Sequence, residues 1–149
     1  MSAFLYRTLA LGTLWVLCAR VPAWATEIAV IVHPNNPVVA MSAREVSDLY
    51  LGRSRSFSVN DQKLPAAVYE QPQDSTLRES FFRALNGMGL KQLNAYWARL
   101  RFSGEVLPPM ILADSRTVLD AVSRNRGGIG YVDAALADAS VKVVLRLKD

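Results

Sequence analysis

Short apolar segments alternate with amphipathic segments from Glu27 to Leu147, and this alternation limits the folds that the chain can adopt. The apolar segments predict strands at 27–32, 64–69, 110–112, 129–132 and 141–147. The amphipathic segments predict helices at about 42–51, 75–85, 90–101 and 115–126, with a short helical turn at 134–137. Strands and helices in this order are typical of a three-layer α/β domain.

Local signals mark several of these boundaries. Ser42 and Glu45 have the spacing of a capping box, and Gly52 follows the apolar stripe of that helix as a stop. Asn60 and Asp61 predict a turn before the second strand. Asp114 or Ser115 is expected to cap the last long helix.

The first 25 residues have the layout of a secretory signal peptide. Arg7 precedes an apolar run from Thr8 to Ala19, and small residues stand at Ala23 and Ala25. The run is shorter than the roughly 20 residues that a membrane-spanning helix needs, so an uncleaved anchor is the weaker alternative. We therefore expect a signal peptide at 1–25, a mature domain at 26–149, and export across the inner membrane to the periplasm.

The composition of this mature domain excludes several classes of protein. Removing the first 25 of 149 residues leaves 124; it lowers the count of basic residues from 17 to 15 against 13 acidic ones, for a net charge of +2. The basic residues are scattered among acidic ones, so nucleic-acid binding is not expected. Cys18 leaves with the signal peptide and His33 is the single histidine, which excludes disulfides and multi-histidine metal sites. We expect no metal, no cofactor and no enzymatic activity, because no activated nucleophile is evident.

Ligands of open α/β sheets bind beyond the carboxyl ends of strands, where helix N-termini present free amides. Three segments of this chain satisfy that rule: the loop at 33–36, the helix start at 74–78, and the helix start at 114–115. Ser75, Thr76 and Arg78 could chelate an oxyanion within one helical turn, or they could be an N-cap followed by a solvated arginine. His33 and Asn35 are further candidate contacts, although a lone histidine at a strand end is more often structural.

Several motifs occur together in an order that resembles a known family. They are the end of the first helix at 48–53, a Ser-headed helix with Phe81 six positions on, Tyr96-Trp97, and the Gly-rich run at 127–132. Together they resemble the phosphate-binding proteins of bacterial phosphate ABC transporters, and more closely the short, single-unit secreted proteins of that type. The resemblance implies a type 2 periplasmic-binding fold reduced to a single compact domain, no catalysis, and an oxyanion held at helix N-termini. Ser75 matches the serine of the family's Ser-Gly-Thr cradle, whereas Gln71 and Gln73 stand where the family has an arginine and an aspartate.

Two functional hypotheses follow. In the first, the protein binds phosphate or a similar oxyanion for ABC-type uptake, with Ser75, Thr76 and Arg78 as the first-choice contacts. In the second, the same fold is an interaction or sensory module that partners a membrane transporter, sensor or envelope protein. The sequence leaves the oligomeric state open.

Overall fold

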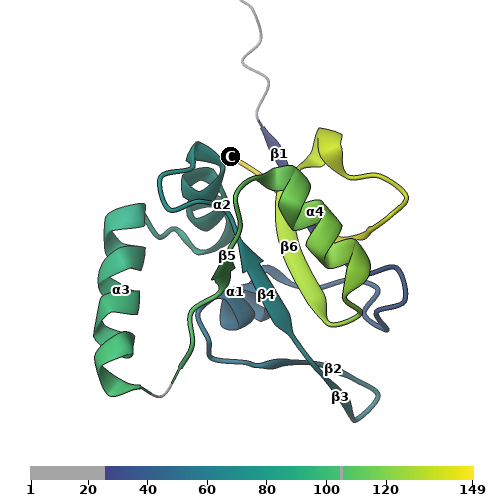
Figure 1. Ribbon diagram of the computed structural model, residues 1–149, viewed down its shortest axis with the longest axis horizontal. Helices are drawn as coiled ribbons and strands as arrows, with labels where there is room; N and C mark the ends of the chain where they lie inside the picture. The colour runs from purple at the N-terminus through teal and green to yellow at the C-terminus, as the bar shows by residue number, and fades with distance from the viewer. Residues whose placement is uncertain (1–25, 105) are drawn as a thin grey trace, which may run out of the picture.

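The computed structural model describes residues 26–104 and 106–149, and the predicted signal peptide lies outside these residues. Its centre is a five-stranded sheet in the order β5-β4-β6-β1-β7 (Figure 1). The strands are β1 (Glu27–Val32), β4 (Ala67–Glu70), β5 (Met110–Ile111), β6 (Gly128–Asp133) and β7 (Lys142–Lys148). None of the helices in the described residues is long and apolar enough to cross a membrane.

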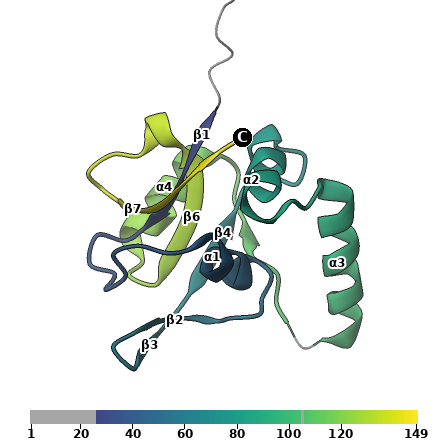
Figure 2. The same cartoon turned by 180° about the vertical axis from the view of Figure 1, so that it is seen from behind.

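The sheet is mixed in direction. β4 runs parallel to β5 and to β6, whereas β1 runs antiparallel to β6 and β7. Figure 2 shows β7 beside β1 at the edge of the sheet opposite β5. β1 is therefore inside the sheet and covered on both faces, which explains its continuous apolar sequence.

Helices cover both faces of the sheet. On one face lie α1 (Ala43–Tyr50), α2 (Thr76–Asn86) and α3 (Leu90–Ser103), and on the other lies α4 (Ser115–Arg124), followed by the short helical turn η1 (Ala134–Leu136). Alternate residues of β1 divide between the two cores: Val30 packs with the first three helices, and Ile31 packs with α4. The predicted three-layer α/β fold class is confirmed.

The helix boundaries follow the local signals. Ser42 and Glu45 form the predicted capping box, in which the Ser42 Oγ accepts from the Glu45 N–H and the Glu45 carboxylate accepts from the Ser42 N–H. Gly52 follows α1 with a φ of 71°, in the left-handed region that favours glycine. Each of these signals acts within one or two helical turns.

The predicted single strand at 64–69 is wrong. The chain instead forms a hairpin of β2 (Ser56–Val59) and β3 (Gln62–Pro65), then breaks at Ala66 before β4. Asn60 and Asp61 form the hairpin turn, both with positive φ, as the sequence predicts for a turn. The break occurs because the backbone changes partners: the Ala66 N–H donates to the Arg55 carbonyl, and the next N–H donates to the Gly127 carbonyl beside the main sheet.

Candidate functional site

A ligand site is expected at the end of the sheet where β4 and β5 have their carboxyl ends. These two strands are parallel, so their last residues, Glu70 and Ile111, lie at the same edge. α2 begins shortly after β4 and α4 begins shortly after β5, so both helix N-termini face this edge from opposite layers (Figure 1). We call this region the carboxyl edge, defined by residues 70–76 and 112–115.

Gln71 ties the two sides of the carboxyl edge together. It is buried, and its Nε2 donates to the Ser115 Oγ at 3.1 Å and to the Tyr131 carbonyl at 2.9 Å. The start of α4 is thereby fixed to the chain that leads into α2. In the sequence, Gln71 is only a position where the phosphate-binding proteins have a charged residue, so this bridging role was not predicted.

Ser75 and Thr76 lie at the start of α2. The Ser75 Oγ accepts from the Arg78 N–H at a long 3.4 Å, so it caps the helix weakly, and Thr76 is exposed. The first amides of a helix have no acceptor inside the helix and carry the positive end of its dipole. This helix start therefore has hydroxyl and amide donors beside the carboxyl edge, and their contact with an anion stays a prediction.

The start of α4 is more fully capped. The Asp114 carboxylate accepts from the Thr117 N–H at 2.8 Å and from the Thr117 Oγ1 at 2.8 Å. These hydrogen bonds hold the pKa of Asp114 below its ordinary value, because they stabilise the charged form. An aspartate charge thus occupies the N-terminus of α4, which leaves α2 as the more open of the two helix starts.

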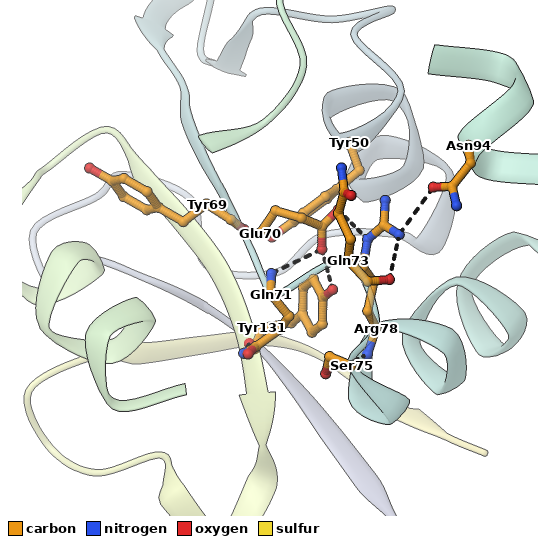
Figure 3. A network of polar contacts seen from close by, with 9 residues as sticks. All are labelled: Tyr50, Tyr69, Glu70, Gln71, Gln73, Ser75, Arg78, Asn94 and Tyr131. Atoms are coloured by element: carbon orange, nitrogen blue, oxygen red, sulfur yellow. Dashed lines mark hydrogen bonds and ion pairs between the residues drawn. The ribbon is translucent and has the colours of Figure 1, made fainter. Parts of the chain in front are cut away.

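Arg78 is buried and paired, so the alternative of a solvated arginine is wrong. Its Nε lies 3.5 Å from the Glu70 Oε2, and the two side chains are 5% and 3% exposed. Its Nη1 donates to the Gln73 carbonyl at 3.3 Å and to the Asn94 Oδ1 at 3.4 Å (Figure 3). The guanidinium carbon also lies 5.7 Å from the centre of the Phe82 ring. The guanidinium therefore points toward α3, and its direct contact with an anion stays a prediction.

Glu70 is the centre of this buried polar network. Its Oε1 accepts from the Tyr131 hydroxyl and, at 3.1 Å, from the Gln71 N–H. Burial raises the pKa of Glu70, and the Tyr131 hydroxyl and the Arg78 charge oppose that increase. Phe81 stacks on the Tyr131 ring with the ring centres 3.6 Å apart, which closes the network from the core side. The sequence pattern places Glu70 in a polar connector, whereas the structure makes it the buried last residue of β4.

The structure places His33 and Asn35 at the end of the sheet that lies opposite to the carboxyl edge. β1 is antiparallel to β6, so the last residue of β1 pairs with Ile129, near the start of β6. Within the loop, the His33 Nδ1 accepts from the Asn35 N–H at 2.9 Å, and the Asn36 side chain donates to the Arg126 carbonyl at 3.1 Å. These residues are not brought together with Ser75, and a role for them in binding stays a prediction.

The donors gathered at the carboxyl edge suit a ligand that accepts hydrogen bonds. Hydroxyl and N–H groups at the helix starts can hold an anion, whereas metal ions need clustered acceptors. Among residues 26–104 and 106–149, no group of three or more His, Cys, Asp or Glu is arranged to hold a metal ion.

Comparison with solved structures finds the same fold in part of several longer proteins. One neighbour, from Clostridium perfringens, is described as a phosphate ABC transporter substrate-binding protein with bound phosphate. It is 23% identical to this chain with a TM-score of 0.62, and the match covers 80% of this chain and 45% of the neighbour. A second, an ABC-type phosphate transport receptor from Vibrio cholerae, is 19% identical with a TM-score of 0.62, over 80% and 46%. A third, PstS from Borrelia burgdorferi, is 12% identical with a TM-score of 0.58, over 80% and 47%.

These likenesses confirm, at the level of the fold, the resemblance to phosphate-binding proteins that the sequence motifs indicate. The chain spans less than half the length of each of these structures. No protein-family profile matches the sequence, and no curated protein is significantly similar to it.

Proposed function

We propose that this protein is a periplasmic solute-binding protein that holds phosphate or a similar oxyanion at the carboxyl edge, for ABC-type uptake. The observation that carries the proposal is the open start of α2, where Ser75 and Thr76 offer hydroxyl and amide donors beside the Gln71 bridge. The fold shared with proteins described as phosphate-binding supports the same function.

Arg78 contributes to this site through the structure of α2. Its N–H donates to the Ser75 Oγ, and its side chain joins α2 to Glu70 at the end of β4. The ion pair with Glu70 cancels most of its charge toward the carboxyl edge. The proposed site therefore depends on Ser75 and Thr76 for contact and on Arg78 for the position of the helix start.

An anion held only at the start of α2 keeps one side in water. Hydrogen bonds to an anion are stronger where water is excluded, so an open edge gives modest affinity until another molecule covers it. We propose the periplasmic face of a membrane transporter as this cover. This chain matches 45% and 46% of the length of two neighbours.

The test is a charge placed at the start of α2. Thr76→Glu should preserve or slightly increase stability, because an acidic side chain in the first turn of a helix is favourable by about 0.3–1 kcal/mol. The same charge should abolish phosphate binding by repulsion. Gln92→Glu is the matched control, since Gln92 is an exposed residue in the first turn of α3, away from the carboxyl edge.

Binding is measured as the shift in thermal unfolding with phosphate, sulfate and a neutral solute at matched ionic strength. A ligand at 100 times its Kd adds about 2.7 kcal/mol of stability. The expected result is a shift with phosphate for the wild type and Gln92→Glu, and none for Thr76→Glu. An equal shift in Thr76→Glu would exclude the α2 start as the site, and no shift in any protein would exclude oxyanion binding.

A second candidate function, an interaction module for a membrane partner, rests on exposed apolar side chains. Phe102, in the last turn of α3, and Leu107, which follows the helix, are 94% and 90% exposed. Such side chains are typical of interaction sites when they cluster. The wild type should then retain a membrane transporter or sensor without any anion, and a Phe102→Ser/Leu107→Ser variant should lose it. Equal retention by the variant would contradict this function.

A further inference from the structure

A groove of about 280 Å³ lies between α3 and the segment 108–111, and it reaches the carboxyl edge at Glu70 and Gln73. The face of α3 that lines it consists of Asn94, Trp97, Ala98 and Arg101, which have the i, i+3, i+4, i+7 spacing of one helical face. Pro109 and Ile111 stand opposite them. The groove thus combines polar and apolar walls.

Arg78 lines this groove as a fixed donor. Glu70, Gln73 and Asn94 hold its Nε and Nη1, and Phe82 covers its guanidinium. Its Nη2 makes no hydrogen bond to any residue in the described ranges, as the free nitrogen in Figure 3 illustrates. A guanidinium held in this way binds a carboxylate without further loss of side-chain freedom.

Arg101 supplies the second cation. It is exposed, and no carboxylate within residues 26–104 and 106–149 forms an ion pair with it. Among residues 26–104 and 106–149, the charged residues that line the groove are Glu70, Arg78 and Arg101. Because Glu70 compensates Arg78, one positive charge remains, which matches a ligand with a single negative charge.

We propose that this groove binds a small organic monocarboxylate with a flat apolar group. The carboxylate accepts from the Arg78 Nη2 and from the Arg101 guanidinium, and the apolar group lies between Trp97 and the side chains of Pro109 and Ile111. The volume is at the lower end of the roughly 300–1,000 Å³ of small-molecule pockets, so the ligand has the size of a single-ring acid. Inorganic phosphate has no apolar group to use these walls.

The contacts proposed here, Arg78 and Arg101, differ from Ser75 and Thr76 of the oxyanion site, although Glu70 and Gln73 belong to both the groove and the carboxyl edge. Its test is a titration of the purified protein with benzoate, inorganic phosphate and benzyl alcohol, followed through the NMR signal of the Trp97 indole N–H. Benzoate should shift this signal with saturation. Benzyl alcohol should bind at least tenfold more weakly, because hydrogen bonds to a charged group contribute about 1.5–3 kcal/mol.

Arg101→Gln is the informative variant and Arg99→Gln its control on the same helix. Arg99 is exposed and lies 5.9 Å from the Tyr96 ring centre rather than in the groove. Arg101→Gln should weaken benzoate binding about tenfold, and Arg99→Gln should leave it unchanged. Ala98→Trp, which fills the groove from an exposed position, should abolish binding while the protein stays folded.

Three results would overturn the proposal. They are no saturable shift with benzoate, equal affinity for phosphate and benzoate, and an equal effect of Arg99→Gln and Arg101→Gln. The second result would identify a general anion site in which the apolar wall has no function.

Discussion

The buried pair of Arg78 and Glu70 leads to the sharpest prediction about this protein. Arg78→Met keeps most of the side-chain volume and removes the charge. Glu70 then keeps its hydrogen bonds from Tyr131 and Gln71 but loses its counter-ion. The carboxylate becomes an uncompensated charge that is about 3% exposed.

The expected loss of stability is large. Removal of one partner from a buried ion pair costs about 3–5 kcal/mol, since the remaining charge stays buried without compensation. In a domain of this size, 1 kcal/mol corresponds to roughly 4 °C in Tm, so Tm should fall by about 12–20 °C. The loss should become smaller at acidic pH, because a protonated Glu70 needs no counter-ion.

The assay is urea unfolding at neutral and acidic pH, with two further variants. Arg83→Met is the matched control on α2, because Arg83 is 55% exposed and pairs with Glu79 at 2.8 Å. Exposed pairs of this kind contribute about 0.3–0.5 kcal/mol. The double variant Arg78→Met/Glu70→Gln removes both charges and should recover most of the loss.

Two results would refute this reasoning. If Arg78→Met were no more destabilising than Arg83→Met, the buried pair would not stabilise the fold. If the double variant were as unstable as Arg78→Met alone, the loss would come from packing around the arginine rather than from an unpaired carboxylate.

Two further predictions concern packing and pH. Gly130→Ala should lower the unfolding free energy by about 1–3 kcal/mol, measured with denaturant, because a Cβ there would lie 2.5 Å from the Val118 Cγ1. Gly89→Ala should lower it far less, because no atom lies within 4 Å of a Cβ at that position. Equal losses would contradict the close contact of α4 with β6. Burial raises the pKa of Glu70 above its ordinary 4.5, so the folded state binds this proton more tightly than the unfolded state, and the stabilisation from that proton is present below pH 4.5 and lost as pH rises through the raised pKa. As pH rises through this range, the unfolding free energy of the wild type should therefore fall relative to that of Glu70→Gln. Tyr131→Phe should extend the range to higher pH, since it removes a hydrogen bond that lowers the pKa of Glu70. A difference between wild type and Glu70→Gln that does not change with pH would contradict the raised pKa.

Much of the candidate site was open to prediction because its signals are local. The Ser75 cap, the free amides after it and the exposed Thr76 follow from a few neighbouring residues at a helix start. The burial of Arg78 was not predictable in this way. Its partners include Glu70 at the end of β4 and Asn94 on α3, and no spacing along the chain specifies that these elements meet.

The three-layer fold class, the ends of the helices and the turn at Asn60-Asp61 are predictable from the sequence, because capping, periodicity and turn preference act over a few residues. The direction of β1 depends on tertiary contacts, and it places His33 and Asn35 at the end of the sheet opposite to Ser75. Tertiary contacts also decide that the chain breaks at Ala66, since that residue bonds to the Arg55 carbonyl rather than to the main sheet. Strand direction and strand partners are set by contacts between distant segments, and the apolar pattern of a strand is the same in either direction.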